Sequence, residues 1–236
     1  MSLHDPSAVR EEYSTEKGLL ARRAAYEHAD GPNAPELVFE AIAEVRPQSY
    51  LEVGCGPGEL AARVQESFGA EVIAIDISPR MVELSRKRGV DAREGDVQRL
   101  PFDDGEFDCA VAAWMLYHVP DVELALDELA RVLRPGGRLV AVTNGLDHLG
   151  ELRELLGLPS RSKTTFSREN GAELLRSRFQ RVDERDASGT VTFPDRDAIV
   201  AYVDASSSFF EGAGDVPDLD APFVVRRAPV VFVATR

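Results

Sequence analysis

The spacing of apolar residues along the chain changes near residue 49. Before that point, segments 18–30 and 34–45 have helical spacing, and the turn-forming sequence Gly-Pro-Asn separates them. After it, short apolar runs alternate with amphipathic stretches. The pattern predicts strands at 49–54, 71–78, 91–97, 107–114 and 137–144, and helices at 59–69, 78–89 and 121–137. Such alternation implies right-handed crossovers, so we expect a parallel sheet covered by helices on both faces.

The pattern is less regular after residue 144. It predicts helices at 148–157, 168–179 and 192–210, and strands at 179–186 and 228–235. The glycine-rich acidic segment 211–222 predicts a mobile loop on this side of the fold. No repeat and no Pro/Ser-rich linker interrupts the chain, so we expect one α/β domain with a doubly wound, Rossmann-like sheet and added lid helices.

Composition narrows the possible partners. The formal charge of −14 argues against nucleic acid, because proteins bind phosphates with Lys and Arg. No apolar run approaches the roughly 18 residues of a membrane span, and the N-terminus lacks a targeting pattern. The two cysteines, Cys55 and Cys109, are expected to be reduced thiols in a cytoplasmic protein with no membrane partner.

The sequence LEVGCGPGEL at 51–60 places glycines at 54, 56 and 58 directly after a predicted strand. In a parallel sheet such a turn lies at the ligand-binding edge, where small residues let the backbone approach a ligand. A dinucleotide loop requires G-x-G-x-x-G, but Glu59 occupies the third position of that spacing. No Gly-Lys-Ser/Thr follows, so the motif is not a P-loop either. A plain tight turn remains the structural alternative.

The segment E-V-G-C-G-P-G resembles the first motif of the class I S-adenosylmethionine-dependent methyltransferases, and the resemblance extends from about residue 49 to 143. The sequence LPF followed by D-x-x-F-D resembles the branch of small-molecule enzymes that includes ubiquinone and sterol methyltransferases. The resemblance implies a seven-stranded, mostly parallel sheet with an antiparallel last strand. It also divides the domain into N-terminal cap helices at 1–46, a cofactor-binding half at 47–145 and a substrate-side half with lid insertions at 146–236.

The same resemblance implies S-adenosylmethionine as the cofactor and assigns roles to residues that match the family motifs. The glycine loop with Glu52 and Cys55 is expected under the amino acid and ribose, and Asp76 at the ribose hydroxyls. Ile77 and Met81 are expected beside the adenine ring, although Met81 equally suits a helix core. The full expected set is Glu52, Gly54, Cys55, Gly56, Gly58, Asp76, Ile77, Met81, Asp96, Val97, Ala113 and Trp114.

The N-terminal segment contains an L-x-A-R element that resembles a leader folding over the cofactor in related enzymes. The resemblance implies that Arg22 reaches the carboxylate of the methionine moiety and that Tyr13 helps to cover the site. A solvated amphipathic helix is the alternative for the same residues. The acids at 103–106 flank Gly105 and are expected to form a solvated turn, with no metal site.

Two histidines are candidate general bases because their ordinary pKa lies near neutrality. His118 follows the fourth strand, in a stretch that resembles the family except that Tyr117 replaces a common histidine. His148 follows the fifth strand. A structural role is the alternative for both. Aromatic residues of the variable region suggest an apolar acceptor pocket: Phe166, Phe193, Tyr202, Phe209 and Phe210.

The function predicted from the sequence is methyl transfer from S-adenosylmethionine to oxygen, nitrogen or carbon of a small organic acceptor. The stretch Ala-Trp-Met-Leu replaces the Asn/Asp-Pro-Pro-Tyr/Phe sequence typical of enzymes that methylate nucleic-acid bases. A non-catalytic cofactor-binding or scaffolding protein of the same fold is the alternative. A nicotinamide dehydrogenase is a third possibility, which Glu59 disfavours. The sequence leaves the acceptor and the oligomeric state open.

Overall fold

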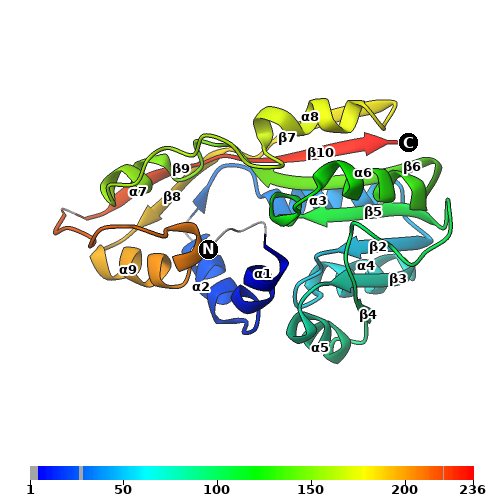
Figure 1. Cartoon of the computed structure of the whole chain (residues 1–236), viewed down its shortest axis with the longest axis horizontal. Coiled ribbons are helices and arrows are strands. Elements are labelled where there is room, and N and C mark those ends of the chain that lie inside the picture. Colours follow the sequence, from blue (N-terminus) through cyan, green and yellow to red (C-terminus); the bar gives the residue numbers. More distant parts are fainter. Residues whose placement is uncertain (1–4, 27–28, 220) are drawn as a thin grey trace.

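The computed structural model describes residues 5–26, 29–219 and 221–236 (Figure 1). Its centre is a seven-stranded sheet of order β4-β3-β2-β5-β6-β10-β7, in which β10 runs antiparallel to both β6 and β7. The predicted α/β architecture with a reversed final strand is therefore confirmed. The strands are β2 (Ser49–Val53), β3 (Glu71–Asp76), β4 (Asp91–Glu94), β5 (Phe107–Ala113), β6 (Leu133–Asn144), β7 (Arg181–Asp186) and β10 (Pro229–Thr235).

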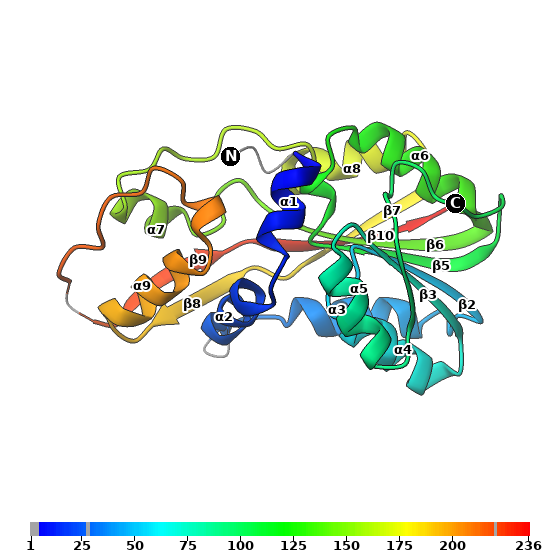
Figure 2. The ribbon, with the colours of Figure 1, turned by 60° about the horizontal axis from the view of Figure 1, so that its bottom comes forward.

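Helices cover both faces of this sheet, as the alternating pattern requires. One apolar cluster contains side chains of α6 and α8, and a second cluster on the opposite face contains side chains of α3, α4 and α5. Figure 2 shows the same division. The helices of the sheet are α3 (Ala34–Ala43), α4 (Glu59–Phe68), α5 (Pro79–Lys87), α6 (Val122–Val132) and α8 (Arg168–Arg176).

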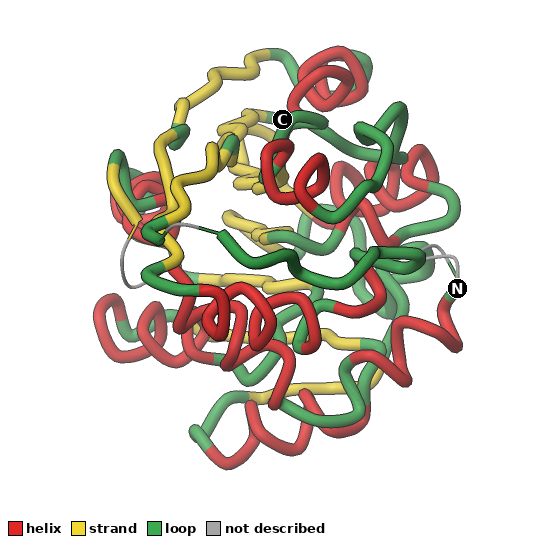
Figure 3. The backbone as a smooth tube through the Cα atoms, turned by 90° about the vertical axis from the view of Figure 1, so that its left-hand side faces the viewer, coloured by secondary structure: helices red, strands yellow, loops and turns green. Residues whose placement is uncertain are grey.

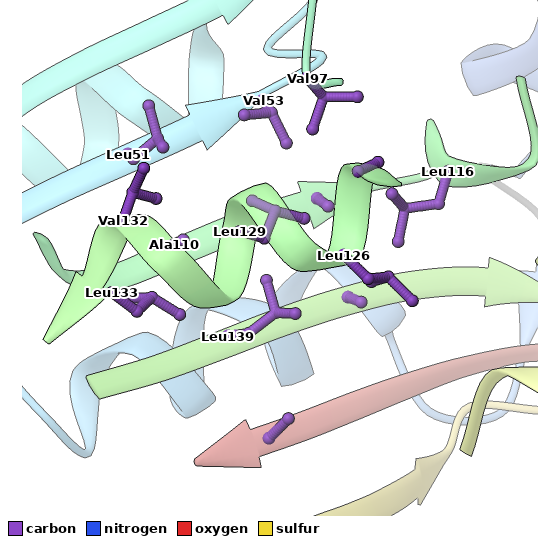
Figure 4. Close-up of a cluster of buried hydrophobic side chains, with 14 of the residues drawn as sticks. Leu51, Val53, Val97, Ala110, Leu116, Leu126, Leu129, Val132, Leu133 and Leu139 are labelled. Carbon is purple, nitrogen blue, oxygen red and sulfur yellow. The ribbon is translucent and has the colours of Figure 1, made fainter. Parts of the chain in front are cut away.

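Helix α6 illustrates how the sequence produces this packing. Its buried residues recur at helical spacing, so that one stripe faces the sheet, where Leu126 and Leu129 pack with Leu139 of β6 (Figure 4). The Asp121 carboxylate caps its N-terminus by accepting the Leu124 N–H at 3.0 Å. Strand β5 is buried over almost its whole length, which is the pattern of a strand covered on both faces.

A second sheet, of order β1-β8-β9, was not predicted from the sequence. Residues 192–193 were assigned to a helix, but they end β8, in which Val191 and Phe193 are buried and their neighbours partly exposed. Helix α9 begins only after Asp195, whose carboxylate accepts the Ala198 N–H at 2.8 Å. The strands are β1 (Ala29–Asp30), β8 (Gly189–Phe193) and β9 (Phe223–Arg227), and α9 spans Arg196–Asp204.

Two predicted helices end earlier than expected. The helix expected at 121–137 ends at Val132, because Arg-Pro-Gly-Gly continues as the start of the long strand β6. The helix predicted at 18–30 is α2 (Lys17–Ala25), and its last two residues, Ala29 and Asp30, form β1 instead. Residues 27 and 28 of that prediction lie outside the described residues, as does residue 220 of the predicted loop. Helices α1 (Pro6–Glu12) and α7 (Gly150–Leu155) and the short 3₁₀ turns Leu116–His118 and Ser207–Phe209 complete the described elements.

The small sheet, α7 and α9 lie together at one end of the molecule, beyond the central sheet (Figures 1 and 2). Helix α1 lies between this end and α5 (Figure 2). Figure 3, turned so that the small-sheet end faces the viewer, shows that end in front of the central sheet. The described helices include none that is both long and apolar enough to cross a membrane.

Candidate active site

A cavity of about 1060 Å³ opens where the parallel strands of the central sheet end. Its wall comes from three parts of the chain: the N-terminal helices, the loops after β2, β3, β4, β5 and β6, and the lid segments around α7 and α9. The carboxyl edge of a parallel sheet is where ligands bind in doubly wound folds. All of the sequence-predicted site residues lie on this wall except Gly58.

The glycine loop is tied to strand β3. The N–H groups of Gly54 and Cys55 donate to the Ile75 carbonyl at 2.7 and 3.2 Å. Gly54 has φ +65°, and a Cβ there would lie 2.6 Å from the Met115 Cβ. Gly56 also has a left-handed φ of +54°, but a Cβ there would meet nothing within 4 Å. The backbone at Gly56 therefore faces open space, as a loop that lies against a ligand requires.

Gly58 has a different role from the one expected. It is the N-cap of α4 with φ +78°, and a Cβ there would lie 2.1 Å from the Ser85 Oγ of α5. It permits close packing of α4 on α5 and does not line the cavity. In dinucleotide-binding folds, the third glycine of G-x-G-x-x-G also permits close packing of the helix that follows. In this chain the packing glycine is Gly58, one position before the third position of that motif.

Asp76 ends strand β3 and is buried. Its Oδ2 accepts the Gly56 N–H and its Oδ1 accepts the Ser78 N–H, both at 2.8 Å. Burial raises its pKa, and these backbone donors partly offset that effect. Each carboxylate oxygen has a second lone pair, so the group can accept two further hydrogen bonds from a ligand in the cavity.

Glu52 lies on β2 behind the glycine loop, with a side chain that is only 4% exposed. The Tyr50 hydroxyl donates to its Oε2 at 3.2 Å. Burial raises the pKa of Glu52 to about 8. The carboxyl group is consequently mostly protonated at neutral pH, and a cation in the cavity would favour its ionised form.

The wall expected beside the adenine ring comes from the ends of β3 and β4. Ile77 lines the cavity, and Met81 does so from α5 with 1% exposure, so Met81 belongs to both the core and the wall. Val97 is also buried on the wall. Asp96 accepts hydrogen bonds from the Gln98 N–H at 2.9 Å and from the Gln98 amide at 3.0 Å. Sequence reasoning missed Gln98, which orients this carboxylate.

Ala113 ends β5 and Trp114 follows it, and both lie on the same wall. Trp114 has φ +53°, a conformation that costs energy for a side-chain-bearing residue, and its N–H donates to the Val142 carbonyl at 3.0 Å. The two cysteines are buried free thiols. Burial raises the pKa of Cys109 to about 12 and also raises that of Cys55, so neither is a thiolate nucleophile at neutral pH.

The N-terminal helices close one side of the cavity. Arg22 forms a salt bridge of 2.8 Å with Glu12, donates to the Ala205 carbonyl at 3.1 Å and lies against the rings of Tyr13 and Phe209. Its guanidinium thus links α1, α2 and the end of α9. Glu12 holds the position that a ligand carboxylate was expected to take.

His118 lies in the 3₁₀ turn after β5 and is 8% exposed. Its Nε2 lies 3.3 Å from the Tyr13 hydroxyl, and burial raises the pKa of Tyr13 to about 12. The rings of Tyr117 and Phe209 pack against the imidazole, with centroids 4.5 and 5.9 Å away. His118 is therefore held between the N-terminal cap and the lid on the cavity wall.

His148 has a defined tautomer. The Ala228 N–H donates to its Nδ1 at 3.0 Å, so that nitrogen carries no proton. Burial, with Arg161 and Arg227 nearby, lowers the pKa of His148 to about 3, which leaves a neutral ring protonated at Nε2. That N–H donates to the Tyr26 hydroxyl at 3.0 Å, and burial together with the neighbouring Tyr202 raises the pKa of Tyr26. Sequence reasoning gave Tyr26 no role beyond its place in the helix predicted at 18–30.

Among the described residues, no three His, Cys, Asp or Glu side chains are grouped so that they could hold a metal ion. Of the lid aromatics, Phe166, Tyr202, Phe209 and Phe210 line the cavity, whereas Phe193 packs in the small-sheet core.

Comparison with known proteins agrees with this geometry. Residues 51–141 match the family model described as a methyltransferase domain. This match identifies residues 51–141 as a methyltransferase domain, and the seven-stranded sheet with its reversed last strand is the fold that the resemblance to the class I S-adenosylmethionine-dependent methyltransferases implies.

Two relatives illustrate the range of the similarity. An uncharacterized 37.1 kDa protein in transposon TN4556 of Streptomyces fradiae is 47% identical over 144 residues, which are 57% of this chain and 39% of that protein. A demethylmenaquinone methyltransferase of Thermus thermophilus is 42% identical over 106 residues, 42% of this chain and 48% of that protein. The chain thus spans less than half the length of either.

In fold, the chain is similar to phospholethanolamine N-methyltransferase 2 of Haemonchus contortus, with a TM-score of 0.66 and 17% identity over all of this chain and 61% of that one.

Proposed function

We propose that the protein transfers the methyl group of S-adenosylmethionine to an oxygen, nitrogen or carbon atom of a small organic acceptor. The observation that carries this proposal is the Asp76 carboxylate, buried on the cavity wall and fixed by the N–H groups of Gly56 and Ser78. Its remaining lone pairs suit the vicinal hydroxyls of a ribose. The methyltransferase-domain match and the small-molecule enzymes among the relatives support the same reading.

The cavity wall fits this cofactor in three respects. Gly56 leaves open space beside the backbone, Asp76 offers acceptors for hydroxyls, and Glu52 offers a carboxyl group that a cation would ionise. Ile77 and Met81 provide an apolar wall for a base, and the Asp96 carboxylate can accept its amino group. We propose the remaining predicted residues, Gly54, Cys55, Val97, Ala113, Trp114, Arg22 and Tyr13, as contacts around them.

S-adenosylmethionine supplies a methyl group that its sulfonium already activates, and the sulfur leaves with the bonding electrons as a neutral thioether. The protein therefore contributes mainly by positioning the acceptor and by excluding water. Tyr117 and Phe209 pack against His118 and provide an apolar surface at that point of the wall.

We propose His118 as the proton acceptor where the acceptor atom must lose a proton. It is buried on the wall, and the neutral Tyr13 phenol lies at its Nε2. His148 is less suited to this role, because its Nε2 carries the proton that it donates to Tyr26. We assign His148 a positioning role, in which it orients the Tyr26 hydroxyl toward Tyr202.

We further propose a cytoplasmic protein that works as a single domain on a free small molecule, with no nucleic-acid or membrane partner. The formal charge of −14 supports the exclusion of nucleic acid. The two free thiols support a reducing compartment.

Calorimetric titration with S-adenosylmethionine tests the proposal. The wild-type protein should bind, and Asp76→Asn should weaken binding by about 1–3 kcal/mol, because a ligand hydroxyl loses a charged acceptor. Asp183→Asn, at an exposed position on β7, is the matched control and should bind like the wild type. Absence of binding, or binding of a nicotinamide cofactor instead, would contradict the proposal. Binding without formation of S-adenosylhomocysteine across a broad acceptor panel would favour the non-catalytic alternative.

A further inference from the structure

The acidic side chains that line the cavity and the basic ones of its lid come from different parts of the chain. The acidic ones come from the glycine loop and the strand ends around it: Glu52, Glu59, Asp76 and Asp96. The lid part carries only basic residues among the described ones: Arg153, Arg161, Lys163 and Arg227. The lid part of the cavity is therefore basic, although the protein as a whole has a formal charge of −14.

Most cations on the wall are already neutralised or hydrogen-bonded. Arg22, Arg23 and Arg63 each form a salt bridge with a glutamate. Arg153 donates to two backbone carbonyls, those of residues 159 and 209, and Arg227 donates to those of residues 30, 32 and 187. These side chains are therefore committed to holding the lid together.

Arg161 differs from the others. Within residues 5–26, 29–219 and 221–236, Arg161 has no hydrogen-bond or carboxylate partner. Its guanidinium carbon lies 5.8 Å from the centroid of the Phe209 ring, which is a cation–π contact. The ring fixes the guanidinium beside the aromatic cluster that contains Tyr117 and His118, because Phe209 packs edge-on against both. Lys163, two residues on, is exposed at the same rim.

Arg161 lines the cavity, and its charge acts on the groups around it. Burial raises the pKa of Tyr117 and of Tyr202, and the positive charge of Arg161 partly opposes both increases. Burial also lowers the pKa of Arg153, and repulsion from Arg161 adds to that effect. Like charges that face one cavity without a counter-ion destabilise one another, and an anion bound between them would remove that cost.

We infer that the methyl acceptor carries a carboxylate, which Arg161 binds in the lid part of the cavity while the apolar body of the acceptor lies against Tyr117, Tyr202 and Phe209. A guanidinium can hold a carboxylate through two parallel hydrogen bonds, which fixes orientation as well as position. The inference rests on the proposed function, and it makes Arg161 a residue that determines specificity.

The test uses the full chain saturated with S-adenosylhomocysteine. Aryl carboxylates, namely benzoate, cinnamate and indole-3-acetate, are titrated by calorimetry beside their neutral amides, which have nearly the same shape. We expect at least one carboxylate to bind about 10- to 100-fold more tightly than its amide, the range for a charge-assisted hydrogen-bonded pair. Arg161→Gln should abolish this preference and leave the affinity for S-adenosylhomocysteine unchanged, which also shows that the variant folds.

Arg181→Gln is the control, because Arg181 is an exposed arginine of β7 that pairs with Asp183 and does not line the cavity. It should retain the wild-type preference. A panel in which no carboxylate binds more tightly than its amide, or a preference that survives in Arg161→Gln, overturns the inference. If the wild-type protein fails to bind S-adenosylhomocysteine, the proposed function fails as well. If it binds S-adenosylhomocysteine but shows no preference for carboxylates, only the inference about Arg161 fails.

Discussion

Glu52 is the residue whose replacement gives the sharpest test of the site's electrostatics. Its carboxyl group is 4% exposed, accepts one hydrogen bond from Tyr50 and has a pKa raised by burial from 4.5 to about 8. The folded state therefore holds a proton that the unfolded state releases between these two values. The free energy of unfolding must decrease as pH rises through this interval.

The size of the effect follows from the two pKa values. The unfolded chain is stabilised by ionising Glu52 while the fold keeps the proton, so the free energy of unfolding is lower by about 3 kcal/mol at pH 7 than for a site that does not titrate. Above pH 8, where the fold must ionise Glu52 as well, this difference levels off at about 5 kcal/mol. Glu52→Gln has nearly the same shape, and its amide oxygen can still accept from Tyr50. The stability of the variant relative to the wild type should therefore increase as the pH rises. A second difference in the free energy of unfolding, caused by the buried amide N–H groups of Gln that have no acceptor, does not change with pH.

Urea unfolding of both proteins from about pH 5 to about pH 9 measures this difference. Other titrating groups are shared, so they cancel when the two curves are subtracted. Glu71→Gln, at an exposed position at the start of β3, should follow the wild-type curve. A Glu52→Gln difference that stays constant over this range would refute the reasoning, because it would mean that Glu52 ionises equally in the folded and unfolded states.

Three further outcomes follow from the site. The ratio of affinities for S-adenosylmethionine and S-adenosylhomocysteine should increase as pH rises toward 8, because ionised Glu52 favours the cationic sulfonium; calorimetry across this range measures it, and a constant ratio would count against the assignment. Gly58→Ala should destabilise the protein by about 1–3 kcal/mol, since φ is +78° and the new Cβ meets Ser85, and adding Ser85→Gly should restore part of that loss in urea unfolding. His118→Gln should lower kcat for a hydroxyl acceptor by about 100-fold or more, measured as formation of S-adenosylhomocysteine; an unchanged kcat would leave the histidine a structural role.

The central sheet could be predicted from sequence because its signals are local. Strands such as 71–76 and 107–113 are apolar runs bounded by turn residues, and each is followed by a helix whose apolar stripe matches it. The small sheet could not, because β8 and β9 are short and their pairing joins residues 189–193 to 223–227. Alternation over so few positions is compatible with the first turn of a helix.

In the site, too, local features could be predicted from the sequence and contacts between distant segments could not. Asp76 and the glycine loop were predictable, because their place at a strand end fixes what they face. Tyr26 and Arg161 were not, because their partners His148 and Phe209 come from distant segments of the chain. Gln98 contacts Asp96 only two residues away, but no motif in the sequence marked it. Gly58 was misassigned because sequence spacing does not distinguish a glycine that faces a ligand from one that faces Ser85.

The two-residue strand β1 pairs with β8 through Ala29 and Val191, and Arg227 of β9 donates to the Asp30 carbonyl at 2.8 Å. The segment before the methyltransferase match and the segment after it are thereby joined into one cover over the cavity. Exchanging acceptor specificity with a relative would require transplanting both ends of the chain together. A chimera that replaces only the C-terminal lid would leave β1 without its partner strand and the Asp30 carbonyl without its donor.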